Sequence, residues 1–217
     1  MKIQKFLHSC LLVEENGKRI LIDPGHYSFD AGILKNLPKI DIILITHSHG
    51  DHCWHEAIQE IAKHDNPTII GNSEVVVDLT EQKLLATEIK IPETIEIAGF
   101  TISSVISPHA PSSPITPPLC NGFYINHKFF HPGDSFAFIE NLLKTPTVLA
   151  LPLIGGWGTA MQSIETGLKV HPQHIIPIHD GFVTSDWVTT KYREHGKIYA
   201  ESGIVFHPLK PGEVLEV

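Results

Sequence analysis

Three histidines and one aspartate lie within six positions of the chain, at His47, His49, Asp51 and His52. Imidazole nitrogens and carboxylate oxygens are ligands that zinc, iron and manganese accept. The group directly follows an apolar run at residues 40–45, which favours a buried strand that delivers these side chains into a turn. The pattern therefore predicts a metal site. A metal ion there would lower the pKa of bound water toward neutrality and so supply a hydroxide.

Three further polar residues follow predicted strands later in the chain, namely His109, Asp134 and His179. Each comes directly after an apolar run, the position from which strand ends commonly present ligands. His109 is the second residue of a stretch, residues 108–118, that contains five prolines. Because proline lacks the backbone N–H that regular elements need, we expect this stretch to be an irregular loop that could rim a pocket.

The elements that must position these residues occur in two similar series. Each series has an antiparallel pair of strands followed by alternating strands and a helix, which predicts two sheets packed face to face with helices outside. We detect no repeat at the level of residues. The expected strands are 1–14, 18–23, 40–45, 68–70, 94–98, 100–107, 122–125, 128–131, 147–151 and 174–178; the expected helices are 53–64 and 160–170, with a helical turn from residue 73.

Composition limits the classes of function. The 217 residues carry a formal net charge of −8 with only two arginines, which argues against nucleic acid or an anionic membrane as a partner. No linker-like segment divides the chain, so residues 1–217 are interpreted as one domain. Three cysteines without paired spacing favour a reducing compartment, and we expect a cytoplasmic protein. No apolar run has the length of a membrane span or the flanks of a signal peptide.

The order of these motifs along the chain resembles that of the metallo-β-lactamase superfamily. Asp23 closes an early strand, the His-x-His-x-Asp-His motif closes a later one, and three single ligand candidates follow. Within that superfamily the chain is similar to the small stand-alone metal-dependent hydrolases related to L-ascorbate-6-phosphate lactonase, the UPF0173 type. The resemblance rests on residues 8–10, 22–24, 46–52, 133–135, 151–161 and 176–179.

This resemblance implies an α/β fold, the four-layer αββα sandwich of the metallo-β-lactamase type. It also implies two divalent metal ions, with zinc favoured and manganese or iron as alternatives. One ion would be held by His47, His49 and His109, the other by Asp51, His52 and His179, and Asp134 would bridge them. Two ions that share a hydroxide can direct it at a polarised carbonyl or phosphoryl group.

Two further roles follow from the same resemblance. Asp51 is the expected catalytic residue, because a free carboxylate oxygen could orient the hydroxide or move its proton. Asp23 would support the ligand loop from behind. The roles of His8, His26 and His131 stay open.

The leading functional hypothesis is a metal-dependent hydrolase that cleaves an ester, lactone, amide or phosphoester bond of a small molecule. The alternatives are an iron-dependent oxidoreductase similar to persulfide dioxygenases, and a non-catalytic metal-binding protein on the same fold. Relatives often associate, so a homo-oligomer is also expected as an option.

We expect substrate choice to depend on three loops, at residues 27–38, 108–118 and 155–160. Aromatic residues near the ligand candidates could form a wall of the substrate pocket, although each could equally serve only in packing: Trp54, Phe136, Trp157, Phe182 and Trp187.

Overall fold

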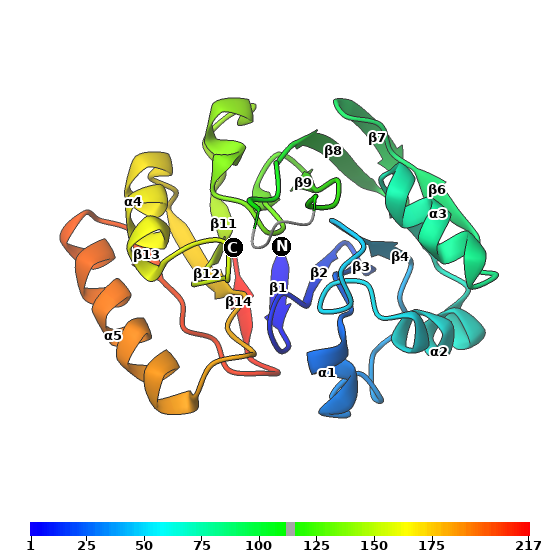
Figure 1. Ribbon diagram of the computed structural model, residues 1–217, viewed down its shortest axis with the longest axis horizontal. Helices are drawn as coiled ribbons and strands as arrows, with labels where there is room; N and C mark the ends of the chain where they lie inside the picture. Colours follow the sequence, from blue (N-terminus) through cyan, green and yellow to red (C-terminus); the bar gives the residue numbers. More distant parts are fainter. Residues whose placement is uncertain (112–115) are drawn as a thin grey trace.

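The structure is a computed structural model that describes residues 1–111 and 116–217. Two seven-stranded sheets face each other, and helices cover their outer faces on both sides (Figure 1). The predicted αββα sandwich is therefore confirmed. Of the predicted loop at residues 108–118, positions 112–115 lie outside the described residues.

The first sheet has the strand order β14-β1-β2-β3-β4-β5-β6. Helices α1 (His26–Asp30), α2 (His55–Asp65) and α3 (Ser73–Glu81) lie beside it. Its strands are β1 (Lys2–Lys5), β2 (Leu11–Glu15), β3 (Lys18–Ile22), β4 (Ile42–Leu44), β5 (Thr68–Gly71), β6 (Ala86–Glu88) and β14 (Val214–Glu216).

The second sheet has the order β13-β12-β11-β10-β9-β8-β7. Helices α4 (Ala160–Val170) and α5 (Ser185–Glu201) cover its outer face, and a short 3₁₀ helix η1 spans Ala137–Asn141. Its strands are β7 (Glu93–Ile97), β8 (Phe100–Ile106), β9 (Asn121–Ile125), β10 (Phe129–His131), β11 (Val148–Pro152), β12 (His174–Ile178) and β13 (Val205–Phe206).

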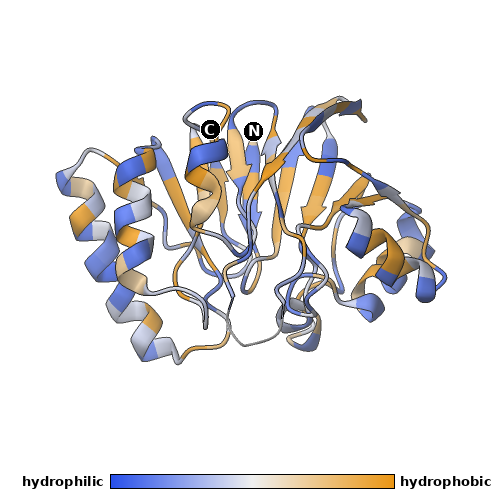
Figure 2. Ribbon diagram, turned by 45° about the horizontal axis from the view of Figure 1, so that its top comes forward, coloured by the Kyte–Doolittle hydropathy of each residue, from blue (hydrophilic) through white to orange (hydrophobic). Residues whose placement is uncertain are grey.

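The side chains of β4 show why a continuous apolar run forms this fold. Because successive side chains of a strand point to opposite faces, Ile42 and Leu44 enter the core between the sheets, while Ile43 packs under the helices of the first sheet. All three are fully buried. A third apolar cluster fills the space between the second sheet and its helices. The strands accordingly form an apolar centre, and the helices are polar on their outward sides (Figure 2).

Strand direction brings the predicted site residues to one edge of the sandwich. In the first sheet β1, β3 and β4 run the same way, since β2 is antiparallel to both β1 and β3 and β3 is parallel to β4. In the second sheet β8, β10, β11 and β12 likewise run the same way. Every ligand candidate follows the carboxyl end of one of these strands, the edge at which open α/β sheets bind ligands.

The prediction of one strand over residues 1–14 is wrong. The chain breaks at residues 6–10 into a tight turn, where Phe6 N–H donates to Cys10 O at 3.0 Å and His8 takes a left-handed backbone with φ of 61°. The apolar run conceals this turn because its side chains stay buried. The turn places His8 at the same edge as the ligand candidates.

Other elements match the sequence predictions closely or extend them. Helix α4 and strand β12 have the predicted bounds, whereas the helical turn expected from residue 73 is a full helix, α3. The sequence patterns did not predict α1, α5, β6, β13 or β14. None of the helices in the described residues combines the length and the apolar character needed to cross a membrane.

Candidate metal centre

Asp134 lies at the middle of the predicted ligand set. Its Oδ2 is 2.9 Å from His179 Nε2 and 3.6 Å from His109 Nε2, and its Oδ1 is 3.0 Å from His52 Nε2. His47 Nε2 is 3.8 Å from the same carboxylate. Asp134 therefore contacts histidines that follow strands of both sheets.

The seven candidates divide into two groups of close ligand atoms. One group joins His47, His49, His109 and Asp134, with all ligand atoms within 4.8 Å of one another. The other joins Asp51, His52 and His179 at the same spacing, together with His8. This division has the same membership as the one that the family resemblance implies, except that His8 is added.

Asp23 orders the ligand loop from behind. Its fully buried carboxylate accepts hydrogen bonds from Thr46 N at 2.8 Å, from Thr46 Oγ1 at 2.8 Å and from His52 Nδ1 at 2.7 Å. Since Thr46 Oγ1 gives its proton to Asp23, it can accept one from His47 Nδ1 at 3.0 Å. Both imidazoles thus carry a proton on Nδ1 and direct Nε2 at the centre, where a bound metal ion would take the place of any proton on that atom.

The histidines of the second sheet are oriented by backbone carbonyls. His109 Nδ1 donates to Ala110 O at 2.7 Å, and His179 Nδ1 donates to Ile154 O at 2.6 Å. In each ring Nε2 faces Asp134. A hydrogen bond at the far nitrogen that fixes the tautomer is the usual arrangement of metal-binding histidine.

Several buried atoms of this cluster lack hydrogen-bond partners. Among the described residues, the side-chain atoms His47 Nε2, His52 Nε2, His109 Nε2 and Asp134 Oδ1 have none of acceptable geometry, although His52 Nε2 and Asp134 Oδ1 lie 3.0 Å apart. An unpaired buried polar atom costs about 1–3 kcal/mol, so four such atoms facing one point are costly unless a ligand binds them. Their chemistry, three imidazole lone pairs and one carboxylate oxygen, fits a divalent cation.

The electrostatics of the cluster also favour a cation. Burial would raise the pKa of Asp134, but the adjacent His52 and His179 hold it well below its usual range. Burial lowers the pKa of His47 well below its usual range, and the charge of His52 adds to this effect. A negative carboxylate beside a neutral imidazole is the state in which both groups can bind a metal ion.

A close backbone contact holds Asp51 in place. A Cβ atom on Gly25 would lie only 1.7 Å from Asp51 O, so no other residue fits at position 25 without moving the ligand loop. His26 N–H donates to Gly50 O at 3.0 Å in the same contact. The segment after β3 therefore supports the motif loop directly.

A cavity of about 320 Å³ opens over the cluster. Each of the three loops expected to govern substrate choice contributes to its lining, through Tyr27, His109 and Trp157. Trp157 Nε1 also donates to Asp134 Oδ2 at 3.2 Å. The remaining lining residues are His49, Asp51, Asp134, Gly156, His179 and Phe182.

Of the aromatic wall predicted from sequence, only Trp157 and Phe182 line this cavity. Phe136 packs behind Trp157, with ring centroids 5.2 Å apart. Trp54 and Trp187 are not among the cavity residues, so that part of the prediction is wrong. The reason is that both tryptophans follow the ligand loops in sequence but sit where the chain has already turned into helices.

Two residues of the site were not assigned a role from the sequence. Tyr27 lines the cavity, and His8 contacts Asp51 Oδ2 through Nε2 at 3.1 Å. Burial lowers the pKa of His8 to about 4. His8 could have been identified only if the turn at residues 6–10 had been recognised.

The remaining histidines with open roles lie outside the ligand groups. His131 ties two loops together, since its Nε2 donates to Ser9 O at 3.1 Å and its Nδ1 accepts from Gly133 N at 3.2 Å. The His26 ring lies against Tyr27, with centroids 4.1 Å apart.

Comparisons with known proteins agree on one family. The profile described as "Beta-lactamase superfamily domain" matches residues 2–179. A UPF0173 metal-dependent hydrolase of Methanocaldococcus jannaschii is 30% identical, with 97% of each chain covered. A second, from Caldivirga maquilingensis, is 32% identical over 97% of this chain and 95% of the relative. Among solved structures, Igni18, a metallo hydrolase of the archaeon Ignicoccus hospitalis, has a TM-score of 0.76 and 27% identity, and the match covers 99% and 97% of the two chains.

Proposed function

This chain belongs to the β-lactamase superfamily and is a metal-dependent hydrolase, and we propose that it cleaves an ester, lactone, amide or phosphoester bond of a small molecule. One observation carries the proposal. Buried, unpaired ligand atoms of His47, His52, His109 and Asp134 meet beneath an open cavity, where a substrate can reach them.

The residues present suit two divalent ions. His47, His49 and His109 would hold one, Asp51, His52 and His179 the other, and Asp134 would bind both. Nitrogen and oxygen ligands favour zinc here and also accept manganese or iron. When bound, such a pair of ions supplies a hydroxide at neutral pH and polarises the oxygen of the bond to be cleaved.

Asp51 is the proposed catalytic residue among the side chains of the centre. Its contacts with His8, His52 and His179 all involve Oδ2, which leaves Oδ1 available to orient a water molecule or to take its proton. The side chain is 25% exposed, whereas that of Asp134 is 2% exposed. Asp51 is therefore the carboxylate that a substrate and its water can approach.

The walls of the cavity would orient the substrate. Trp157 and Phe182 offer apolar faces on one side, and Tyr27 offers a ring with a hydroxyl group. His49 is exposed at the mouth, where it can contact both an ion and a bound molecule. A cavity of about 320 Å³ suits a small molecule and not a folded macromolecule.

The other predictions from sequence remain part of this proposal. The formal charge of −8 disfavours nucleic acid as substrate, and the chain is proposed to act in the cytoplasm as one domain that can associate with further copies. The hydrolase names of the relatives give no support to an iron-dependent oxidoreductase or to a non-catalytic metal-binding protein.

The proposal is tested by metal content and hydrolysis on one preparation. Protein purified without chelators is assayed by elemental mass spectrometry, and the same sample is screened with p-nitrophenyl esters, γ-lactones, an anilide and bis-p-nitrophenyl phosphate. We expect about two ions per chain and turnover of one substrate class that is lost with chelator and restored by zinc or manganese. A single iron per chain, or no metal after reconstitution, would contradict the proposal.

A further inference from the structure

His8 differs from the other histidines of the centre in the direction of its hydrogen bonds. In His52, His109 and His179 the nitrogen facing away from the centre, Nδ1, donates to an oxygen. In His8 the corresponding Nδ1 faces the backbone N–H of Gly181 at 3.1 Å. Because that N–H can only donate, His8 Nδ1 must hold a lone pair.

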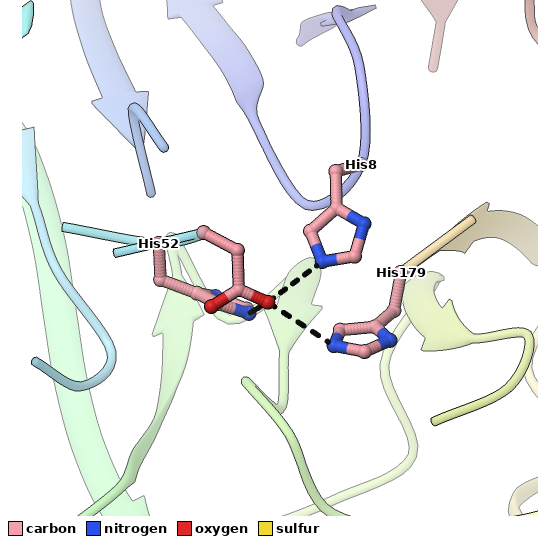
Figure 3. A group of neighbouring side chains, drawn as sticks. His8, His52 and His179 are labelled. Atoms are coloured by element: carbon pink, nitrogen blue, oxygen red, sulfur yellow. Dashed lines mark hydrogen bonds and ion pairs between the residues drawn. The ribbon is translucent and has the colours of Figure 1, made fainter. Parts of the chain in front are cut away.

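The tautomer of His8 follows from this contact. An imidazole whose Nδ1 accepts a hydrogen bond carries its proton on Nε2. That atom lies 3.1 Å from Asp51 Oδ2, so His8 donates a hydrogen bond to the carboxylate. Figure 3 shows the rings of His8, His52 and His179 directed at one carboxylate, that of Asp51, whose Oδ2 lies 3.1, 3.8 and 3.6 Å from the three Nε2 atoms.

Distance alone would allow another role for His8. Its ligand atom lies within 4.8 Å of those of Asp51, His52 and His179, a spacing that would suit a fourth metal ligand. A protonated Nε2 has no lone pair to offer an ion, however. The direction of the Gly181 hydrogen bond therefore separates the two roles that distance cannot separate.

The surroundings of His8 hold its ring in this orientation. His179 N–H donates to His8 O at 3.3 Å, and the two rings lie with centroids 4.1 Å apart. A Cβ atom on Gly181 would lie 3.0 Å from His8 Cβ and 3.2 Å from Nδ1, so glycine leaves room for the ring. His8 is only 1% exposed. The turn after β1 is thus hydrogen-bonded to, and packed against, the loop that carries His179.

We propose that His8 is a positioning residue, which donates a hydrogen bond from Nε2 to Asp51 Oδ2 and thereby orients that carboxylate toward the ion shared with His52 and His179. The inference rests on the two-ion centre proposed above. Partners that orient a metal ligand typically change metal affinity by about 10- to 100-fold. Substitution of His8 should therefore change the affinity for the ion held by Asp51, His52 and His179. The affinity for the ion held by His47, His49 and His109 should stay unchanged.

Two substitutions separate this role from the alternatives. Asparagine places its amide near the position of Nδ1, so His8→Asn keeps an acceptor for Gly181 N–H but loses the donor to Asp51. Glutamine places its amide N–H₂ near Nε2, so His8→Gln keeps the donor. Asparagine also tolerates the left-handed backbone at φ of 61°, so His8→Asn is expected to fold.

The first measurement is zinc affinity, determined by competition with a fluorescent chelator, with the thermal midpoint of the metal-free proteins recorded in parallel. We expect His8→Asn to weaken binding of the ion held by Asp51, His52 and His179 by about 10- to 100-fold and His8→Gln to stay within about threefold of wild type. Equal loss in both variants would assign His8 as a ligand, and no loss in either would remove the positioning role. Either result overturns the inference.

The second measurement needs no metal at all. Long-range ¹H–¹⁵N correlation spectra of the metal-free protein report which nitrogen of each imidazole carries the proton, and the signals of His8 are identified by their absence in His8→Asn. We expect an Nε2–H pattern for His8 and an Nδ1–H pattern for His109. An Nδ1–H pattern for His8 would overturn the inference even if two ions bind. Failure to bind two ions would instead count against the proposed function.

Discussion

The two sheets build the same centre in different ways. The first sheet supplies four ligand candidates from one loop after β4, and a single buried side chain, Asp23, holds that loop through three hydrogen bonds. The second sheet supplies single residues from three separate strand ends. Of these, His109 and His179 are each fixed by a backbone carbonyl.

The ligand candidates of the first sheet are therefore neighbours in sequence, whereas those of the second sheet are far apart in sequence. On the first side one substitution behind the loop can disturb several ligands, because Asp23 orients His52 directly and His47 through Thr46. In the second sheet no side chain within residues 1–111 and 116–217 orients His109 or His179 in this way, so each should respond independently. Asp134 is the exception, since it contacts histidines from both sheets.

The largest expected effect is the loss of this common residue. In Asp134→Asn the negative charge that both proposed ions would share is removed, so we expect metal content to fall from about two ions per chain to fewer than one. Any hydrolysis should fall by roughly a thousandfold or more. Elemental mass spectrometry of matched preparations measures the first effect.

His49→Ala is the comparison variant. It removes one exposed ligand of the first group only, so about one ion per chain should remain. If Asp134→Asn and His49→Ala retained the same amount of metal, Asp134 would not be a bridge.

The next effect tests whether Asp23 holds the ligand candidates of the first sheet together. Asp23→Ala leaves two N–H groups and one hydroxyl without their buried acceptor, so we expect a loss of about 3 kcal/mol in the free energy of unfolding of the metal-free protein. Zinc affinity should also fall by about 10- to 100-fold. Urea unfolding and chelator competition measure the two quantities.

Asp41→Ala provides a control on the same sheet. Asp41 accepts hydrogen bonds from Arg19 N at 3.0 Å and Lys18 Nζ at 2.9 Å, but no ligand candidate is among its partners. We expect a smaller loss of stability, about 1 kcal/mol, and no change in zinc affinity. Equal zinc affinities for Asp23→Ala and wild type would show that the loop does not need its buried support.

The same contrast explains what the sequence could predict. The ligands of the first side are adjacent in sequence, so their residue types and spacing are visible in one motif. Those of the second side become neighbours only because β8, β10 and β12 share one direction and end at one edge. Residue patterns indicated the strands, but the grouping of His109, Asp134 and His179 came from resemblance to a family.

His8 and helix α5 mark the limits of prediction from pattern. The run of buried residues around His8 has the composition of a strand, and only the backbone turn at residues 6–10 reveals its position in the centre. Helix α5 is largely exposed and carries few buried residues, namely His195 and Tyr199, so its apolar periodicity is weak. Both features depend on packing against distant segments.

A smaller effect tests the hydrogen bond that Trp157 donates to Asp134. Trp157→Phe keeps an aromatic ring in the cavity but removes the N–H that donates to Asp134 Oδ2 at 3.2 Å. A hydrogen bond to a charged group contributes about 1.5–3 kcal/mol, and part of this is lost to water at a half-exposed site, so we expect zinc affinity to fall by about tenfold. Trp187→Phe, at a tryptophan that does not line the cavity, should leave the affinity unchanged.

The smallest effect concerns the segment that carries Trp157 into helix α4. Thr159 begins this helix with a capping box, in which its hydroxyl accepts from Gln162 N at 3.2 Å and Gln162 Oε1 accepts from Thr159 N at 2.9 Å. Thr159→Ala should therefore cost about 1 kcal/mol in the free energy of unfolding. Thr184 occupies the same position in α5 without a side-chain cap hydrogen bond, so Thr184→Ala should change stability by less than about 0.5 kcal/mol. Urea unfolding of both variants tests this difference, and equal losses would contradict it. Metal content should stay at the wild-type level in both, because His109 and His179 are fixed by backbone carbonyls and not by the helix that follows.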